Sequence, residues 1–421
     1  MEEWKIYRLG DLVDFQNGYA FKPSKFLYDG KYKIIRIKEL KNGLVKFFED
    51  TVSISDEPNE ILSKILVNKG DVIFALTGDP VSKQNANSWV GRVSLYTHDI
   101  PAYLNQRTCK IIQCNNVVPQ YVYYYFRQYE NLYSLASKAT GSASQANIST
   151  KILEDTEILL PSLSVQKKMV AILASLDNKI ALNRRINDNL EQQAQALFKS
   201  WFVDFEPFKD GKFVESEIGM IPEGWKVGKL EDIADVVGGG TPSKANALYF
   251  DKQCIPWITP KDLSIKKTKF ISKGEIDITE EGYKNSSAKK IPLGSVLFSS
   301  RAPIGYISIA ENELTTNQGF KSVVPVKAGT SFLYLYLKAN TKAIEAQATG
   351  STFKEASGSL MKSLCVIIPP DTVFDSFERN AFPFFSAQAN VEREIVNLSK
   401  ARDTLLPRLM SGELKINDSN C

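Results

Sequence analysis

The sequence predicts a mixed α/β (α+β) protein built from two similar modules, each followed by a long helix. Sequence blocks of the first half recur in the same order in the second half, which indicates an internal duplication. Within each half, short apolar runs follow a glycine, as buried strands do. After each half comes a helix-forming stretch with apolar residues at heptad spacing. We therefore expect two pseudo-symmetric domains separated by two long helices that pack as an antiparallel coiled coil.

The duplication consists of seven matched blocks in a single order. Residues 4–12 (WKIYRLGDL) open the first half, and residues 225–233 (WKVGKLEDI) open the second. Insertions differ between the copies, whereas the blocks persist, so the two modules share a scaffold and differ in their loops. The other matched blocks are 37–40 with 260–263, 69–74 with 293–298, 105–106 with 317–318, 123–126 with 334–337, 139–142 with 348–351, and 159–161 with 367–369.

The matched blocks also predict local structure. The apolar runs after Gly70 and Gly294 are short and are typical of buried strands. In the Tyr-rich block 123–126 and in 332–337, apolar side chains recur three and four residues apart, which favours helices. Each module is therefore expected to mix sheet and helix over about 160 residues.

The stretch from Val165 to Trp201 contains neither glycine nor proline and predicts one long helix. Asn183 interrupts its apolar seam, either to fix the register of a partner helix or simply as a solvated side chain. The seam residues on the first heptad position are Met169, Leu176, Asn183, Leu190 and Leu197, with Ile172 and Ile186 on the partner position and Leu173, Ile180 and Ala194 flanking.

A second helix follows the second module. Pro383 is expected to exclude an early start and Pro407 to kink or end the helix near Leu406, so this helix should be the shorter one. Two helices with apolar seams would bury them against each other, with the modules at opposite ends. About 35 helical residues span about 50 Å, more than one turn of B-DNA at about 34 Å, so the pair could act as a ruler. Its seam residues are Val391, Ile395, Leu398, Arg402, Leu405 and Leu409.

Composition bounds the class of protein. The 421 residues carry a net charge of +4, which supports nucleic-acid binding only weakly. Five cysteines without a C-x-x-C pair fit reduced thiols, and the single histidine, His98, excludes His-rich metal sites. No apolar run approaches the roughly 20 residues of a membrane span, and the N-terminus lacks a signal-peptide pattern, so we expect a cytoplasmic protein without membrane contact.

Enzymatic motifs are missing from the sequence. The run 238–242 (GGGTP) lacks the G-x-G-x-x-G spacing of a cofactor cradle and continues into a proline, so a loop is expected. An Asn/Asp-Pro-Pro-aromatic segment, which an amine methyltransferase would need, is absent. A nuclease site from Asp371, Glu413 and Lys415 would have to bring together residues on either side of a predicted helix, so we expect no catalytic residues and no metal site.

Several segments resemble the central region of type I restriction-modification specificity subunits. They are 160–168 (LPSLSVQKK), 182–187 (LNRRIN), 196–205 (ALFKSWFVDF), 221–225 (IPEGW) and 405–414 (LLPRLMSGEL). The resemblance covers the whole chain but departs from the family at 374–385, where a Gln-Lys helix start like Gln166-Lys167 is usual. It divides the chain into a target-recognition domain (1–162), a central conserved helix (163–205), a linker (206–224), a second target-recognition domain (225–370) and a distal conserved helix with a C-terminal tail (371–421).

The resemblance implies a non-catalytic subunit that binds a split, asymmetric double-stranded DNA target. It further implies that the conserved helices dock two modification subunits, which methylate adenine, and that restriction subunits join the complex and cleave unmodified DNA. S-adenosylmethionine, ATP and magnesium would belong to those partners, and this chain would bind no cofactor. A stand-alone bivalent DNA-binding regulator is the alternative, and mixing with a modification subunit distinguishes the two.

Base reading requires side chains that reach groove edges, with Arg on guanine, Asn or Gln on adenine and Lys mostly on phosphate. Because Asn-Gln recurs in both modules, it is as consistent with scaffold or phosphate contact as with base contact, whereas the unmatched residues 83–87 are better specificity candidates. Candidates in the first module are Lys38, Thr77, Lys83, Gln84, Asn85, Asn87, Arg92, Asn105, Gln106, Arg107, Ser142, Ser144, Gln145 and Asn147. Those in the second are Lys261, Arg301, Asn317, Gln318, Lys321, Thr352 and Lys354.

Overall fold

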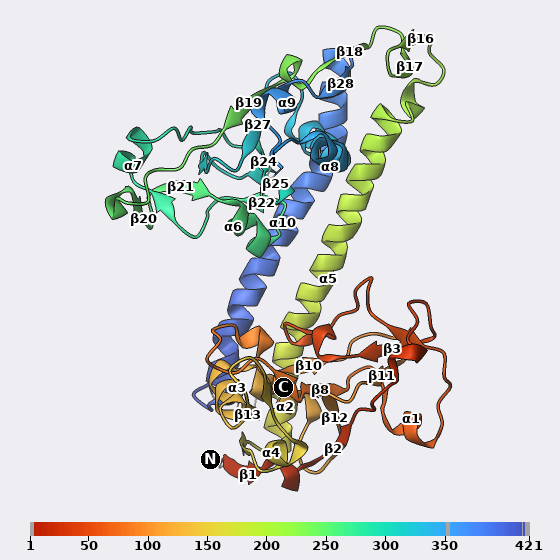
Figure 1. Cartoon of the computed structure of the whole chain (residues 1–421), viewed down its shortest axis with the longest axis vertical. Coiled ribbons are helices and arrows are strands. Elements are labelled where there is room, and N and C mark those ends of the chain that lie inside the picture. The colour runs from red at the N-terminus through yellow and green to blue at the C-terminus, as the bar shows by residue number, and fades with distance from the viewer. Residues whose placement is uncertain (1–3, 351–353, 415, 417–421) are drawn as a thin grey trace. The chain divides into compact units, whose positions relative to one another are not determined.

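The computed structural model describes residues 4–350, 354–414 and 416, which divide into two compact units. Unit 1 comprises the described residues of Met1–Lys179 and Leu398–Cys421, and unit 2 is Ile180–Asn397. Two helices of 40 residues each, α5 (Leu163–Phe202) and α10 (Asp371–Met410), contribute one part to each unit. Figure 1 shows α5 in yellow-green and α10 in blue.

Unit 1 is built on a six-stranded sheet whose centre is the predicted strand after Gly70. This strand, β8, pairs antiparallel with β10 and β12, and all four of its residues are buried. A smaller sheet contains a parallel pair, β3 with β11. The strand order is β2 (Val13–Asn17), β12 (Thr108–Cys114), β8 (Val72–Ala75), β10 (Val93–Leu95), β5 (Leu44–Val45) and β4 (Leu40–Lys41) in the first sheet, and β6 (Ser53–Ile54), β3 (Tyr32–Ile35), β11 (Ala102–Leu104) and β7 (Leu66–Val67) in the second.

Helices and short strands complete unit 1. The predicted Tyr-rich helix is α2, and four consecutive residues from Tyr121 to Tyr124 are buried in the main core, where they meet Phe74 of β8 and Leu173 of α5. The other elements are β1 (Lys5–Arg8), η1 (Leu9–Asp11), η2 (Pro23–Lys25), η3 (Ile37–Glu39), α1 (Glu60–Lys64), β9 (Thr77–Gly78), η4 (Ala86–Ser88), α2 (Pro119–Arg127), α3 (Tyr129–Ala136), β13 (Thr140–Gly141), β14 (Ala146–Asn147), α4 (Thr150–Glu154) and β15 (Glu157–Leu160).

Unit 2 repeats this plan with fewer strands. Its five-stranded sheet has the predicted strand after Gly294, β24, at the centre, and its four-stranded sheet again contains a parallel pair, β21 with β26. The first sheet is β19 (Ala234–Gly238), β27 (Lys321–Pro325), β24 (Val296–Ser300), β25 (Ile304–Ala310) and β22 (Phe270–Ile271), and the second is β20 (Phe250–Asp251), β23 (Asp277–Ile278), β21 (Ile255–Ile258) and β26 (Thr315–Thr316). The remaining elements are η5 (Glu206–Phe208), β16 (Phe213–Ser216), β17 (Gly219–Pro222), β18 (Lys226–Lys229), η6 (Leu230–Asp232), η7 (Ala247–Tyr249), α6 (Pro260–Lys266), α7 (Glu280–Lys284), α8 (Thr330–Gln347), α9 (Gly358–Lys362) and β28 (Cys365–Ile368).

The sequence repeat is also a repeat of structure. The first block forms β1 in unit 1 and β18 in unit 2, and each pairs antiparallel with the strand that precedes a long helix. The registers correspond, since Lys5 lies opposite Leu160 and Lys226 opposite Ile368. Each of these last strands is preceded by a five-residue helix, α4 or α9, capped by Ser149 or Ser357. The predicted α+β class and duplication are confirmed.

The heptad prediction for α5 placed the second apolar position of the seam one residue too early. Met169 and Asn183 are buried as predicted, but Ile172 and Ile186 are 39% and 38% exposed. The buried partner position is occupied by the predicted flanking residues Leu173, Ile180 and Ala194. Adjacent apolar residues at 172 and 173 made both registers compatible with the sequence. The three other seam residues, Leu176, Leu190 and Leu197, are half-buried.

The second helix is not the shorter one, contrary to the prediction from its prolines. Helix α10 passes through both Pro383 and Pro407 and equals α5 in length. Proline has no N–H, so the carbonyl of Arg379, four residues before Pro383, loses its usual donor. Both residues are exposed, so water can donate to that carbonyl instead. Phe374, Phe377, Ala381 and Phe385 are buried in the core of unit 2 on both sides of the proline, and this burial outweighs a penalty of about 3 kcal/mol. The predicted seam residues Val391, Ile395, Leu398, Arg402 and Leu405 are half-buried.

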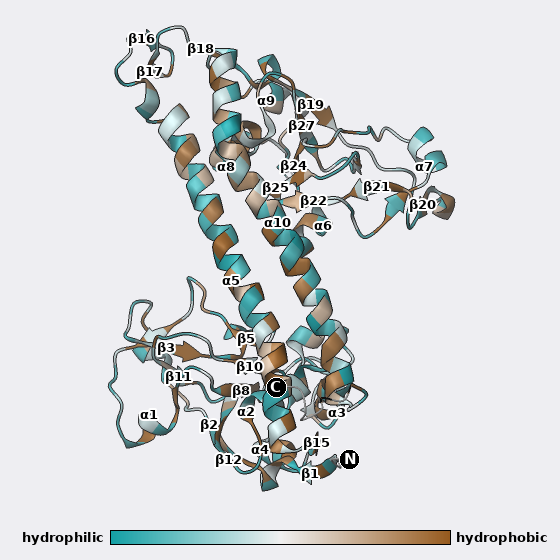
Figure 2. Ribbon diagram, turned by 180° about the vertical axis from the view of Figure 1, so that it is seen from behind, coloured by the Kyte–Doolittle hydropathy of each residue, from teal (hydrophilic) through white to brown (hydrophobic). Residues whose placement is uncertain are grey.

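Within unit 2, α5 and α10 run antiparallel. Asn183 Nδ2 donates to Glu394 Oε2 at 2.9 Å, and Gln388 Nε2 donates to the carbonyl of Asn187 at 3.3 Å, so rising residue numbers on α5 meet falling numbers on α10. Asn183 is 1% exposed and hydrogen-bonded, which favours a register-fixing role over a solvated side chain. Figure 2 shows hydrophobic and hydrophilic residues alternating along both helices, as expected for helices with one buried face.

Other expectations from composition can be placed in the structure. His98 packs against the rings of Phe47 and Tyr96 in tilted contacts, and its Nε2 lies 2.9 Å from the carbonyl oxygen of Val45, which is a packing role. The four cysteines in the described part of the chain, at 109, 114, 254 and 365, are free thiols. Among the described residues, no helix is long and apolar enough to cross a membrane.

Candidate nucleic-acid interface

In unit 1 the predicted polar loops meet at one place, although they are far apart in sequence. Strand β14 pairs with both β9 and β13 and thereby joins the loop after Thr77 to the loop after Thr140. Thr77 Oγ1 donates to Asn147 Oδ1 at 2.8 Å, and Thr77 is 2% exposed. The carbonyl of Arg107 accepts from the backbone of Leu76 at 2.9 Å, which adds the Asn105–Arg107 turn to the same face. Thr77 and Asn147 therefore hold the loops together.

Arg92 has a structural role in this assembly. Its guanidinium donates to the carbonyls of Ile37 at 2.6 Å and of Ser88 and Trp89 at 3.0 Å, and so joins η3 to the loop 77–92. Burial lowers the pKa of Arg92, although Asp79 opposes that shift. We therefore assign Arg92 to positioning the loops rather than to contact with DNA.

Some of the remaining candidates of unit 1 make hydrogen bonds within the protein, and others are exposed. Lys83 bonds Asp79 at 2.8 Å and by this hydrogen bond lowers the pKa of Asp79, and Lys38 Nζ lies 2.6 Å from Asp50 and lowers the pKa of Asp50 in the same way. Asn85 caps η4 by accepting from the backbone of Asn87. Ser142, Ser144 and Gln145 are exposed at the tip of the β13–β14 hairpin, where the Ser142 hydroxyl contacts Ser144. Gln84, Asn87, Gln106 and Arg107 are also exposed.

The recurrent Asn-Gln pair occupies the same structural position in both units. Backbone N of Asn105 donates to Ile35 at 3.0 Å, and backbone N of Asn317 donates to Ile258 at 2.9 Å, in each case just beyond the parallel strand pair. A glycine directly after β2 or β19 backs each turn. A Cβ added at Gly18 would lie 2.1 Å from the carbonyl oxygen of Asn105, and one at Gly239 would lie 2.0 Å from that of Asn317. The backbone of Asn105 and that of Asn317 are thus part of the scaffold of their units.

The same close contacts explain the glycine-rich run of the second module. A Cβ at Gly240 would lie 2.2 Å from the backbone nitrogen of Ala288, and the carbonyl of Gly240 accepts from Trp257 Nε1 at 3.0 Å. Gly239 and Gly240 therefore allow close backbone contact and do not form an open loop that could cradle a phosphate.

In unit 2 two of the candidate residues, Arg301 and Lys321, meet at one carboxylate. Glu355 accepts from Lys321 Nζ at 3.1 Å and lies 3.5 Å from Arg301 Nη1. The side chain of Arg301 is 37% exposed, so it is only partly covered by its own module. Lys261, on the first turn of α6, is exposed, and its hydrogen bond to Glu275 at 2.7 Å raises the pKa of Lys261. Gln318 and Lys354 are exposed, whereas Thr352 lies outside the described residues.

Sequence reasoning missed a buried polar cluster in unit 2. Lys269 Nζ bonds Glu191 of α5 at 2.9 Å and Gln388 of α10 at 2.7 Å, and its side chain is 4% exposed. Burial lowers the pKa of Lys269 to about 8, a shift that Glu191 only partly offsets. Burial also opposes ionisation of Glu191, but the charges of Lys269 and Lys338 hold the pKa of Glu191 at about 2. The sequence offered one indication of this cluster: Glu191, Gln388 and Glu392 are polar residues on the buried faces of the two predicted helices.

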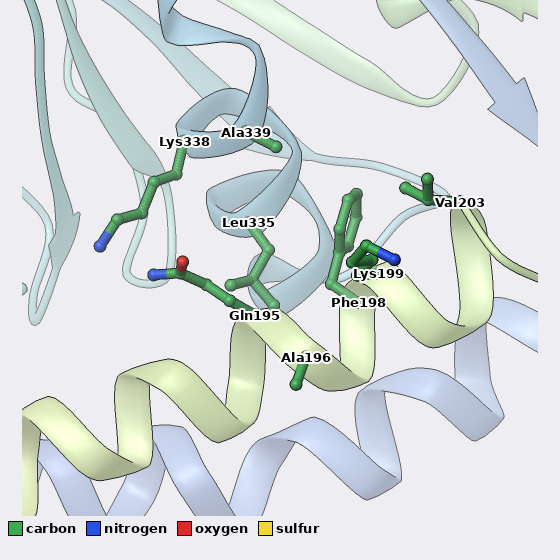
Figure 3. Close-up of a pocket in the computed structure, with 8 residues that line it drawn as sticks. All are labelled: Gln195, Ala196, Phe198, Lys199, Val203, Leu335, Lys338 and Ala339. Carbon is green, nitrogen blue, oxygen red and sulfur yellow. The ribbon is translucent and has the colours of Figure 1, made fainter.

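A pocket of about 410 Å³ lies between α5 and α8 in unit 2. Figure 3 shows Phe198 and Leu335 among its lining residues, together with Lys199 and Lys338. None of the eight lining residues is a carboxylate, a histidine or a cysteine, so the pocket offers no carboxylate or imidazole beside its two lysines. In the part of the chain that the structure describes, no cluster of His, Cys, Asp and Glu is arranged to hold a metal ion.

Comparison with known proteins identifies the family. The sequence model of the type I restriction modification DNA specificity domain matches residues 1–192 and again 222–373, which is most of the chain and one match for each module. The chain belongs to the type I restriction-modification specificity subunits. Subunits of this family are the DNA-recognition components of their systems, are not the catalytic ones and carry no cofactor themselves. They assemble into a complex and bind DNA.

Individual relatives agree with this assignment. The specificity subunit of the type I restriction enzyme HindI of Haemophilus influenzae is 26% identical over 98% of this chain and 100% of its own length. That of MjaIX of Methanocaldococcus jannaschii is 45% identical over 162 residues, which are 38% of this chain and 37% of that subunit. The crystal structure of a type I restriction-modification system S subunit from M. genitalium has the same fold, with a TM-score of 0.62, 15% identity and coverage of 97% of this chain and 96% of that one.

Proposed function

We propose that this specificity subunit reads a bipartite, asymmetric DNA target, with one module for each half. The observation that carries the proposal is that the two units present the same scaffold with different polar side chains. Each unit has an Asn-Gln turn in close contact with a glycine. The polar residues of the loops differ between the units: Lys83, Gln84 and Asn87 in unit 1, and Arg301, Lys321 and Glu355 in unit 2. Identical readers would favour a palindrome, and divergent readers favour two different half-sites.

We further propose that α5 and α10 dock two modification subunits, with restriction subunits joining that core. Both helices carry exposed large apolar side chains: Leu163, Ile172, Leu182 and Ile186 on α5, at 39%, 39%, 49% and 38%, and Phe382 and Val396 on α10, at 62% and 58%. Ile172 and Ile186, like Phe382 and Val396, are 14 positions apart, which places each pair on one helix face. S-adenosylmethionine, ATP and magnesium would then act on the partners, which methylate adenine or cleave unmodified DNA. The domain boundaries inferred from the sequence, 1–162, 163–205, 206–224, 225–370 and 371–421, are part of this proposal.

Exchange of one module tests the two-reader proposal. Residues 1–162 are replaced by the equivalent module of another specificity subunit, the hybrid is assembled with its modification subunits, and methylated adenines are mapped on DNA. We expect one half of the recognised sequence to change and the other half and the spacing to persist. An unchanged motif would contradict the proposal. Full affinity of the native chain for its target, unaffected by modification subunits, would favour a stand-alone regulator instead.

A point substitution tests the reader role of Arg301. We expect Arg301→Ala to lower affinity by about 1–3 kcal/mol and to relax base preference in one half-site only, because a guanidinium that reads guanine is lost. Binding is measured on duplexes with substitutions at each target position. Lys226→Ala, an exposed lysine on β18, serves as the control and should bind like the native chain. Equal weakening on every sequence would indicate a phosphate contact.

A further inference from the structure

The buried cluster around Lys269 lies where the second module meets the long helices. Lys269 follows α6, which carries Lys261 at its second position, and directly precedes β22, the edge strand of the five-stranded sheet. The backbone carbonyl of Lys269 accepts from Ile309 of β25 at 2.7 Å, and Ser308 Oγ donates to the carbonyl of Thr268 at 2.8 Å. One short segment therefore connects a helix of the candidate DNA face to the module's sheet.

The same segment is held by both helices. The side chain of Lys269 bonds Glu191 of α5 and Gln388 of α10, and its ammonium lies 3.3 Å from the ring centroid of Phe385. The backbone nitrogens of Lys269 and Phe270 donate to the two carboxylate oxygens of Glu392 at 2.9 and 3.2 Å. These contacts come from several directions, so a rotation or a slide of the module on the helices would break most of them.

Stability alone does not account for a lysine in this position. A buried ion pair gives little net stabilisation, because removing both charges from water offsets their attraction, and apolar residues of similar size are often equally stable. The directional hydrogen bonds of such a pair instead define one arrangement of the groups that make it. Gln388 extends the same network across the helix pair, since its Nε2 donates to the carbonyl of Asn187 and, at 3.2 Å, to Glu191.

The first module contacts its helix through different residues. Gly43 takes the equivalent place there: it directly precedes β5, and its carbonyl accepts from Leu95 of β10 at 2.9 Å. A Cβ at Gly43 would lie 2.8 Å from Arg127 Nε. Arg127, which aligns with Lys338 in the repeat, reaches Asp177 of α5 at 3.3 Å instead. Each module thus has its own cation–carboxylate contact with the helices, and the Lys269 contact is specific to the second.

We propose that Lys269 is a positioning residue that fixes the second reading module on the helix pair and thereby sets which separation of the two half-sites the protein accepts. This rests on the proposed two-reader function. Adding one base pair to the spacer moves the second half-site by about 3.4 Å and rotates it by roughly a tenth of a turn. A module held from several directions resists that displacement, whereas a loosened module follows it.

The test uses Lys269→Met in the chain assembled with its modification subunits. Glu191 keeps Lys338 at 2.6 Å, so the variant leaves no unpaired carboxylate there. Affinity is measured for duplexes that carry both half-sites with the native spacer or with one base pair more or fewer. We expect the preference for the native spacer to fall at least tenfold while base preferences within both half-sites persist. Lys269→Arg, which retains the cation, should restore part of the preference, and Lys342→Met, an exposed lysine of α8, should leave it intact.

Each result of this experiment bears on the proposal. An unchanged spacer preference, or an equal loss of affinity on all spacers, would overturn it. If Lys269→Met does not fold, judged by thermal unfolding, Glu191→Gln takes its place, and a native-like spacer preference in that variant would overturn the proposal equally. If the native complex itself shows no preference for two half-sites, the two-reader function fails and not the role of Lys269 alone.

Discussion

Gly18→Ala and Gly239→Ala are each expected to abolish recognition of one half of the target and to leave the other half intact. The added methyl group would lie about 2 Å from a backbone carbonyl of the Asn-Gln turn, and backbone atoms cannot move aside as a flexible side chain can. Overpacking of this kind costs about 1–3 kcal/mol or more, and we expect the upper end, about a hundredfold in affinity. Binding is measured on duplexes with either half-site scrambled.

The neighbouring residue provides a matched control for this experiment. A Cβ at Gly238 would meet no atom within 4 Å, so Gly238→Ala should read both halves normally. Native discrimination by Gly239→Ala, or an equal loss at both half-sites in either variant, would contradict the assignment of one turn to each half-site.

Asp177→Ala is expected to destabilise unit 1 by about 2–4 kcal/mol. Asp177 accepts from Tyr124 at 3.0 Å, Arg127 at 3.3 Å and Arg402 at 2.8 Å, and the side chains of both arginines are less than a fifth exposed. Removing the carboxylate leaves two largely buried cations without their shared partner, which is the costly way to break an ion pair.

Thermal unfolding of the purified chain measures this effect, and a midpoint lower by several degrees is expected. Asp188→Ala removes an exposed carboxylate from the same helix and should leave the midpoint unchanged. Equal midpoints for Asp177→Ala and the native chain would show that solvent screens the cluster more strongly than its burial indicates.

The duplication made most of the fold predictable from the sequence. Once residues 4–12 were matched to 225–233, the central strands β8 and β24 and the helices α2 and α8 followed from local apolar patterns. The proline rule failed at Pro383 because it counts one lost hydrogen bond, whereas the helix also gains the burial of Phe377 and Phe385, which depends on tertiary contacts.

The candidate site was predictable in outline but not in detail. Polar loops could be identified by composition, and β9, β13 and β14 bring those of unit 1 together. The role of Arg92 could not be predicted, because its partners are carbonyls, among them that of Ile37, 55 residues away. The burial of Lys269 could not be predicted either. Residues 266–269 contain three lysines, a composition that indicates a solvated segment, and the positions of the surrounding glutamates follow only from the structure.

The division of the chain into units has a consequence for the order in which the protein folds. Unit 2 is one continuous stretch, Ile180–Asn397, whereas the core of unit 1 includes Leu406, Leu409 and Met410 beside residues of the first module. During synthesis the first module leaves the ribosome first but obtains these last core residues only after unit 2 has emerged. Folding from the N-terminus onward, the usual order for domains, therefore cannot complete unit 1, and its unfilled core is exposed until α10 is made.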